Sequence, residues 1–315
     1  MKFCTLLIIV CVFAGCTNKQ SEPIRIGINP WPGYEFMFLA GHKGFFKRVG
    51  LDIELVQLGS LSDAQRAYIN GKTDGMATTI IEAVQSSPLG GAPLKVVLIP
   101  DYSNGGDVIV ANKSVGDMKS LKGKKVGCEV SSLGIYILQR ALSRAGLTLQ
   151  DVEVVNVEQF QGEKYMLEGI IDAFVSYPPV SVKILNHNQY HTVFTSAEIP
   201  NEIIDTISLS ETIIKANPDL VPKLHLAWQL ALDYYKTNPT DAIAIMAKRE
   251  GIAPDEFAGV LSDLVILDNA EQIKIFSDPD KLQTAAKSVC ETLVHVESIS
   301  TDCENYPDII YRGKI

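Results

Sequence analysis

The sequence predicts an α/β protein of two lobes followed by a helical C-terminal segment. Short β-rich runs alternate with helical patterns over the first two-thirds of the chain. Roughly 290 residues remain after an N-terminal leader and a short tether, more than one hydrophobic core usually holds. One layout also occurs twice, at 69–79 and 167–177: a helix end, a glycine, an aspartate and a short apolar strand. The chain therefore uses one βαβ scheme in each of two lobes.

The predicted strands are mostly continuous apolar runs, as is typical of strands buried on both faces of a mostly parallel sheet. They cover 24–28, 52–58, 75–79, 94–100, 107–112, 125–130, 152–157, 173–177 and 192–196. The helices predicted between them cover 35–48, 61–71, 79–87, 132–146, 160–169 and 178–186.

The pattern changes at about residue 208, where the chain becomes almost entirely helical. Four prolines stand at expected helix starts, where a missing N–H costs little: Pro218, Pro222, Pro239 and Pro254. We expect residues 24–106 to form the first lobe and 107–205 the second. Residues 206–315 then complete the first lobe and add the C-terminal helices.

The N-terminus has the features of a targeting segment. Lys2 precedes an apolar stretch from Phe3 to Phe13, too short to span a bilayer. The small residues Ala14 and Gly15 then precede Cys16, which resembles a bacterial lipoprotein signal whose cysteine is lipidated. Residues 1–15 are thus expected to be a signal peptide and 16–23 a tether. The protein would lie on the periplasmic or cell-surface side of a membrane. An ordinary secretory signal is the alternative.

The remaining cysteines fit an oxidising compartment. Cys290 and Cys303 are close in sequence and are expected to form a disulfide, whereas Cys128 ends an apolar run and is expected to be buried and free. Their spacing fits no zinc pattern. His187 and His191 are four residues apart, a spacing that could hold a metal, but we favour an exposed helix end as the explanation.

Net charge and the absence of catalytic motifs argue against a nucleic-acid-binding protein and against the common classes of enzyme. The net charge is −9, and about −10 without the leader, which disfavours nucleic acids and anionic surfaces as partners. The common nucleophile, zinc, P-loop and dinucleotide motifs are absent from the sequence. We expect a protein that is not an enzyme and uses no cofactor or metal.

Candidate ligand-binding residues follow the predicted strands, because ligands of open α/β sheets lie at the carboxyl ends of the strands. They are Trp31, Tyr34, Thr78, Thr79, Asn104, Asp107, Glu129, Ser131, Ser132 and Tyr177. Each has a structural alternative. The serines could cap a helix or bind an anion, the "DYSNGGD" segment could be a hinge or a cleft wall, and the aromatic side chains could pack between lobes.

The residue types leave two ligand classes open. These segments contain no Arg or Lys but five carboxylates, at Glu35, Glu82, Asp101, Asp107 and Glu129. Acids with aromatic rings suit a neutral or cationic ligand, such as an aminopyrimidine or an amine. Hydroxyls with helix amides suit a sulfonate or another small anion. We favour the nitrogen-containing ligand.

The stretches "IRIGINPWPGYEFMFLAGHKGFF", "SNGGDVIVAN", "GKKVGCEVSSLGIYILQRAL" and "EGIIDAFVSYPPV" resemble the NMT1/THI5-like group of periplasmic solute-binding proteins for sulfonates, taurine and thiamine precursors. The resemblance covers about residues 24–205. It implies a type II periplasmic-binding-protein fold that closes over a small molecule, with Trp31, Thr78, Ser131, Ser132 and Tyr177 in cleft-lining segments. The enzymatic, pyrimidine-synthesising branch of this group carries a Cys-rich motif that is absent from the sequence.

The resemblance also implies a partner. An ABC permease would receive the ligand from a monomeric binding protein held at the membrane by its lipid. The alternative partner is a membrane sensor kinase or cyclase that reads ligand occupancy.

Overall fold

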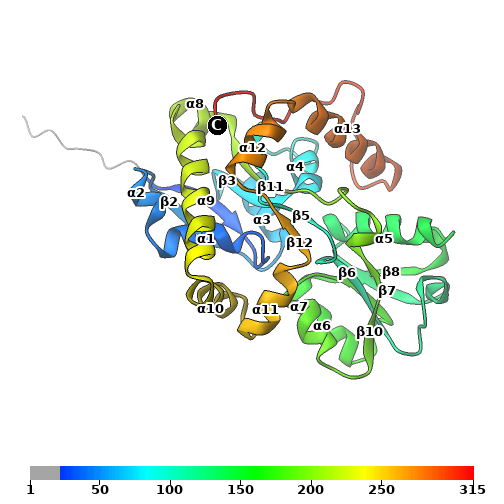
Figure 1. Cartoon of the computed structure of the whole chain (residues 1–315). Helices are drawn as coiled ribbons and strands as arrows, with labels where there is room; N and C mark the ends of the chain where they lie inside the picture. The colour runs from blue at the N-terminus through cyan, green and yellow to red at the C-terminus, as the bar shows by residue number, and fades with distance from the viewer. Residues whose placement is uncertain (1–21) are drawn as a thin grey trace, which may run out of the picture.

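The computed structural model describes residues 22–315. The predicted signal peptide and the lipid attachment at Cys16 lie outside the described residues. Two five-stranded sheets, each covered by its own helices, form two lobes, and a two-stranded sheet lies between them (Figure 1). This arrangement agrees with the predicted α/β fold of two lobes.

In the first sheet, four strands point the same way and one is reversed. The order is β2 (Ile53–Gln57), β1 (Ile24–Ile28), β3 (Gly75–Thr79), β11 (Asp205–Ser210) and β4 (Leu94–Leu98). β11 is antiparallel to both of its neighbours, so the chain returns from the second lobe into the middle of the first.

The second sheet repeats this order. Its strands are β8 (Glu153–Asn156), β7 (Lys125–Cys128), β9 (Ala173–Ser176), β6 (Val108–Asn112) and β10 (Tyr190–Thr195). β6 is the reversed strand here and occupies the place that β11 has in the first sheet. The repeated layout read from the sequence is thereby confirmed, since its two copies end in the equivalent strands β3 and β9.

Helices cover the sheets of both lobes, with α5–α7 on the second lobe and the others on the first (Figure 1). In the first part of the chain they are α1 (Glu35–His42), α2 (Phe45–Arg48), α3 (Leu61–Ile69), α4 (Ile80–Ser86), α5 (Leu133–Arg144), α6 (Gln159–Leu167) and α7 (Val180–Leu185). The later ones are α8 (Glu211–Ala216), α9 (Leu220–Thr237), α10 (Pro239–Glu250), α11 (Pro254–Leu261), α12 (Asn269–Phe276) and α13 (Pro279–His295). Short 3₁₀ helices occupy Met118–Leu121, Leu149–Asp151 and Ser196–Glu198.

Three differences from the predicted elements are clear. The helix predicted over 35–48 is two helices, because Gly44 adopts a left-handed conformation (φ 73°) between α1 and α2. β11 was not predicted, since its sequence "DTISLS" alternates with serine and threonine although the strand is central and buried. β5 (Asp101–Ser103) and β12 (Leu264–Ile266) were also missed, the latter inside a segment predicted to be helical.

The chain crosses between the lobes near residues 103–107 and 196–204. The hydroxyl groups of Ser103 and Ser196 lie 2.8 Å apart, and the Gly105 N–H donates to Ser196 Oγ at 2.7 Å. β5 pairs with β12 beside these crossings. Asp205 opens a strand of the first sheet, although the sequence assigned residue 205 to the second lobe. The other lobe boundaries stay predictions.

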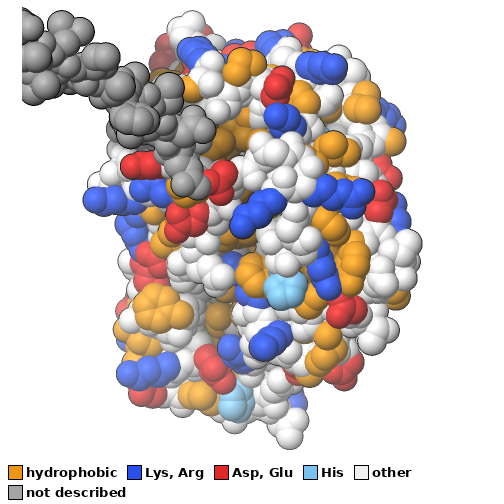
Figure 2. All heavy atoms as spheres, turned by 90° about the vertical axis from the view of Figure 1, so that its left-hand side faces the viewer, with side chains coloured by type: hydrophobic (Ala, Val, Ile, Leu, Met, Phe, Trp, Pro, Cys, Tyr) orange, Lys and Arg blue, Asp and Glu red, His pale blue; other side chains and the backbone are white. Residues whose placement is uncertain are grey.

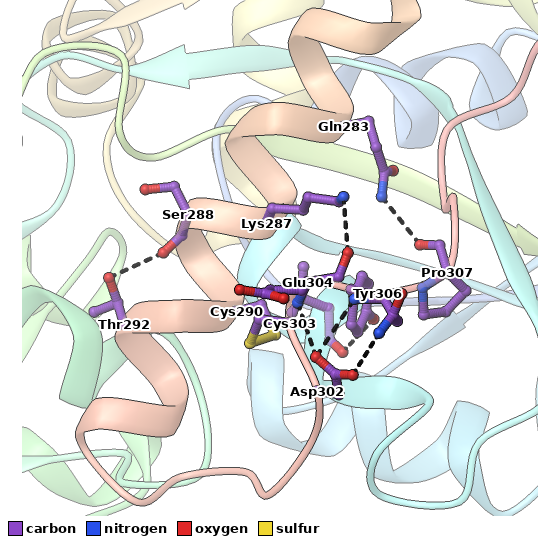
Figure 3. Close-up of a disulfide and its surroundings, with 12 residues drawn as sticks. Gln283, Lys287, Ser288, Cys290, Thr292, Asp302, Cys303, Glu304, Tyr306 and Pro307 are labelled. Atoms are coloured by element: carbon purple, nitrogen blue, oxygen red, sulfur yellow. Dashed lines mark hydrogen bonds between the residues drawn. A yellow bond between two sulfur atoms is a disulfide. The ribbon is translucent and has the colours of Figure 1, made fainter.

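The C-terminal segment is fastened to the first lobe. Cys290 of α13 and Cys303 form a disulfide (Figure 3), and Cys128 is buried and free. Around the disulfide, Lys287 donates to the carbonyl of Glu304 and Gln283 to that of Pro307, both at 3.1 Å. Beyond it, Tyr306 donates to Val84 O of α4, and the Val96 N–H of β4 donates to Ile309 O.

One face of the molecule carries charged side chains of both signs together with hydrophobic ones (Figure 2). On the face shown in Figure 2, Lys and Arg side chains are interspersed with Asp and Glu. Between residues 22 and 315, none of the helices combines the length and apolar character that a bilayer crossing requires.

Candidate functional site

A small cavity lies where the two lobes meet. Its volume is about 10 Å³, the space of a single water molecule, so the cleft is closed in this structure. Side chains from both lobes line it: Asn29, Trp31, Leu61, Thr79, Asp107, Leu133, Tyr177 and Asp205.

Two aromatic rings, one from each lobe, line the cavity and contact each other. Trp31, in the turn after β1, and Tyr177, which follows β9, meet edge to face with ring centroids 6.0 Å apart. The Leu61 N–H donates to the Tyr177 hydroxyl at 3.3 Å, across the cleft. A Cβ on Gly106 would lie 2.9 Å from the Trp31 ring, so the glycine allows the indole to rest against the lobe crossing. Trp31 of the "NPWPGY" turn therefore lies at the lobe interface.

Three buried aspartates, Asp101, Asp107 and Asp205, lie close together beside this cavity. Trp31 Nε1 donates to Asp101 Oδ2 at 3.3 Å, and the Tyr34 hydroxyl donates to Asp205 Oδ1. The other oxygens of these two aspartates, and both oxygens of Asp107, are buried without a hydrogen-bond partner. A Cβ on Gly33 would collide with Asp101, which explains the glycine in the turn.

Burial raises the pKa of each of these aspartates. For Asp107 the pKa rises to about 7, first because of desolvation and then because the charge of Glu82 lies nearby. The pKa values of Asp101 and Asp205 also rise through burial. The charges of Asp101 and Asp107 raise the pKa of Asp205 further. Glu129, 2% exposed, has a pKa raised by burial and an unpartnered Oε1. The site is thus rich in acids that lack a cation.

Glu82 of α4 joins the two lobes. Its Oε2 accepts from the N–H and hydroxyl of Thr79, at 2.9 and 2.6 Å, within its own lobe. Its Oε1 accepts from Ser132 Oγ and from the Leu133 N–H, both at 2.7 Å, at the start of α5. Ser132 is the N-cap residue by position, but its hydroxyl makes no capping bond and donates to Glu82 instead. Neither a serine cap nor an empty anion site describes this helix start, since a glutamate of the other lobe occupies it.

A larger cavity lies at the mouth of the cleft. It has a volume of about 250 Å³ and shares Tyr177 with the small one. Pro30 and Gly59 line it from the first lobe, next in sequence to the segments that line the small cavity. The buried Glu250, with both oxygens unpartnered, and the exposed Lys183 also line it. The two cavities therefore lie along one cleft.

The ten residues proposed from sequence fall into three groups. Trp31, Thr79, Asp107 and Tyr177 line the small cavity. Tyr34, Thr78, Glu129 and Ser132 are buried but do not line it. Asn104 and Ser131 are exposed. Tyr34, proposed to offer its ring to a ligand, is fully buried and donates a hydrogen bond to Asp205.

The sequence proposal missed Asn29, Leu61, Leu133 and Asp205 as lining residues. The sequence did offer a signal for Asn29, because it directly follows β1 and begins the turn that contains Trp31. Asp205 had no local signal, because it opens the unpredicted strand β11.

The two histidines considered for a metal have separate partners. His187 pairs with Glu163 at 2.9 Å, and His191 Nε2 lies 2.7 Å from the Val115 carbonyl. Among residues 22–315 there is no group of three or more His, Cys, Asp or Glu residues arranged to hold a metal ion.

Comparisons with known proteins agree with this architecture. The periplasmic aliphatic sulphonate-binding protein SsuA of Escherichia coli superposes with a TM-score of 0.73 at 18% identity, covering 91% of this chain and 98% of that one. The periplasmic nitrate-binding protein NrtA of Synechocystis superposes with a TM-score of 0.69 at 13% identity, covering 90% and 84%. At these identities the likeness establishes the periplasmic-binding-protein fold.

Sequence relatives point to the same group. A Brucella abortus protein named only as a binding protein is 24% identical over 237 residues, 72% of this chain and 71% of its own. A 4-amino-5-hydroxymethyl-2-methylpyrimidine phosphate synthase of Saccharomyces cerevisiae is 25% identical over 227 residues, 68% of this chain and 66% of its own. The family model described as NMT1/THI5 like matches residues 31–242. The chain belongs to the NMT1/THI5-like family.

Proposed function

We propose that this protein is an extracytoplasmic solute-binding protein that captures a small organic molecule carrying a basic nitrogen, an amine or a thiamine-precursor-like heterocycle, and delivers it to an ABC importer. The observation that carries the proposal is the buried carboxylate of Asp107, whose two oxygens lack partners inside a cavity that Asp205 also lines.

Electrostatics supports a cationic or hydrogen-bond-donating ligand. Buried carboxylates are costly unless they are paired or hydrogen-bonded. Among the cavity-lining residues no Lys or Arg supplies that charge. A protonated nitrogen between Asp107 and Asp205 would offset the desolvation of both acids. The faces of Trp31 and Tyr177 would add cation–π attraction or stacking.

The relatives leave room for this ligand class. The two structural neighbours are named for anions, a sulphonate and a nitrate, whereas the yeast relative is named for the phosphate of an aminopyrimidine. A sulfonate would meet several buried acids in the present cavity. We therefore favour a basic nitrogen over a sulfonate, and we expect the rest of the molecule to extend past Tyr177 into the mouth cavity.

The test is a thermal-shift and calorimetry screen of residues 17–315 against amines, aminopyrimidines, nucleobases, sulfonates and small carboxylates. A ligand at a hundredfold excess over its Kd stabilises by roughly 2.7 kcal/mol. Stabilisation by amines or aminopyrimidines alone supports the proposal, whereas stabilisation only by sulfonates contradicts it. Mass spectrometry of the recovered ligand should find it unchanged, because the proposed role is binding and not synthesis.

Two aromatic variants and one acidic variant locate the site. Trp31→Ala and Tyr177→Ala should each weaken binding of the hit by more than about 1 kcal/mol through lost aromatic contact. Asp107→Asn should weaken it through lost charge, whereas Asp52→Asn, the same change at an exposed position, serves as the matched control. Unchanged affinity in all three cleft variants would remove the site from this cavity.

The anchoring and the partner belong to the same proposal. We expect Cys16 to carry lipid, so that Cys16→Ser should abolish metabolic labelling with palmitate. A ligand-sensing role toward a membrane kinase or cyclase is the second candidate for the partner. Uptake of the labelled hit by cells with and without the gene distinguishes the two roles, since a sensor would leave uptake unchanged.

A further inference from the structure

We propose that Glu82 sets the charge specificity of the cleft: when the lobes are closed, its carboxylate occupies the anion-binding start of α5, so the protein rejects anionic ligands. This inference rests on the proposed solute-binding function and narrows its ligand class. It is carried by the four hydrogen bonds of Glu82 and by the position of its partners, since both Thr79 and Leu133 line the small cavity.

The start of α5 has the features of an anion site. The helix is twelve residues long, and its first N–H, that of Leu133, is directed at the lobe interface together with the Ser132 hydroxyl. Unpaired N–H groups and the helix dipole favour a negative charge at such a position. The carboxylate of Glu82 supplies that charge from the other lobe.

Glu82 is held in this position from both sides. Its side chain is fully buried, and each oxygen accepts two hydrogen bonds of 2.6 to 2.9 Å. An anionic ligand would have to displace a carboxylate that four donors satisfy, or else lie beside it. An anion beside Glu82 would also lie near Asp107, whose two oxygens are buried and unpartnered in the same cavity. Both routes are unfavourable for an anion, whereas a cation would be attracted by Asp107 and Asp205.

The experiment asks whether removal of Glu82 creates an anion site. Purified residues 17–315 carrying Glu82→Ala are titrated with acetate and methanesulfonate, with sodium chloride at equal ionic strength as the reference. Acetate has the shape of the lost carboxylate. We expect the variant to bind these anions at least tenfold more tightly than the unchanged protein. Adding Ser132→Ala should reverse most of the gain.

The matched control is Glu271→Ala. Glu82 is the third residue of α4 and forms a capping box there, and Glu271 has the same role in α12. Glu271 is exposed, so its loss removes a helix cap without changing the cleft. This control should gain no anion affinity. If Glu82→Ala does not fold, Glu82→Gln keeps the shape and removes the charge, and a smaller gain in anion affinity is then expected.

Two results would overturn the proposal. One is tight binding of sulfonates or carboxylates by the unchanged protein. The other is a folded Glu82 variant that gains no anion affinity. The amine screen is run on the same samples, so a failure of the proposed amine ligand is seen separately from a failure of the anion test.

Discussion

At the residue scale, the site is defined by acids kept in a dry interface. Asp107 is the clearest case, because it is 1% exposed and neither of its oxygens is hydrogen-bonded. Its pKa, raised from 3.8 to about 7, means that the folded protein binds this proton more tightly than the unfolded chain does. Folding without ligand is therefore opposed once the acid ionises.

The stability of the ligand-free protein should show this effect. Because the folded pKa is raised, the Asp107 contribution to the free energy of unfolding is greatest below pH 4 and falls as the pH rises to 7. Asp107→Asn removes this pH-dependent term. Relative to the unchanged protein, the free energy of unfolding of the variant should rise by about 3 kcal/mol between pH 4.5 and pH 8. Urea unfolding at both pH values measures the difference, and an equal difference at each would contradict the assignment.

At the element scale, the C-terminal segment completes the first lobe. α13 packs on α4, and the chain after it reaches β4, where the Tyr311 N–H donates to the Val96 carbonyl. The Cys290–Cys303 disulfide closes the loop between these two attachments, over a separation of 13 residues (Figure 3). A cross-link over a loop of this size stabilises by roughly 3 kcal/mol, largely by restricting the unfolded chain.

Replacing both cysteines by serine should therefore lower the free energy of unfolding by about 2–3 kcal/mol. Ligand affinity should not change, because none of the residues lining the small cavity belongs to α13 or to the segment after it. Denaturant unfolding and calorimetry measure the two quantities. Reducing agent should destabilise the unchanged protein and leave the double-serine variant unaffected, and the opposite pattern would exclude a structural disulfide.

At the scale of the whole molecule, the lobes meet through direct hydrogen bonds between their side chains. Besides Glu82, Ser60 donates to Glu158 at 3.3 Å, and Arg66 lies 3.4 Å from the same carboxylate. The hydroxyl groups of Ser62 and Ser131 lie 3.3 Å apart across the cleft. We expect a ligand to separate the rings of Trp31 and Tyr177 and to leave the hydrogen bonds of Glu82 and Glu158 in place.

Ser62 and Ser131 give a direct measure of closure. Cysteines at both positions should form a disulfide under mild oxidation, since the hydroxyl oxygens they would replace lie 3.3 Å apart in the closed arrangement. Ligand should accelerate the cross-link by populating the closed form. Intact mass with each single-cysteine variant as control follows the reaction. A rate that does not respond to a confirmed ligand would argue against closure around it.

Local sequence determined much of the fold. The apolar runs and the glycines that end helices identified β1, β3 and the helices that follow them, because these signals depend on neighbours along the chain. The repeated layout indicated two lobes of one scheme. The aromatic turn at Trp31 and the polar residues after β3 and β9 indicated where the cleft lies.

Only the tertiary structure decided how the site is built. β11 is central because it pairs with β3 and β4, which lie more than a hundred residues away in the sequence. The local sequence "DTISLS" does not predict this pairing. The return of that strand brings Asp205 beside Asp107, and closure of the lobes places Glu82 on Ser132. Sequence supplied the acids and the serines, whereas their pairing required contacts between distant segments, and those contacts determine the charge of the cleft.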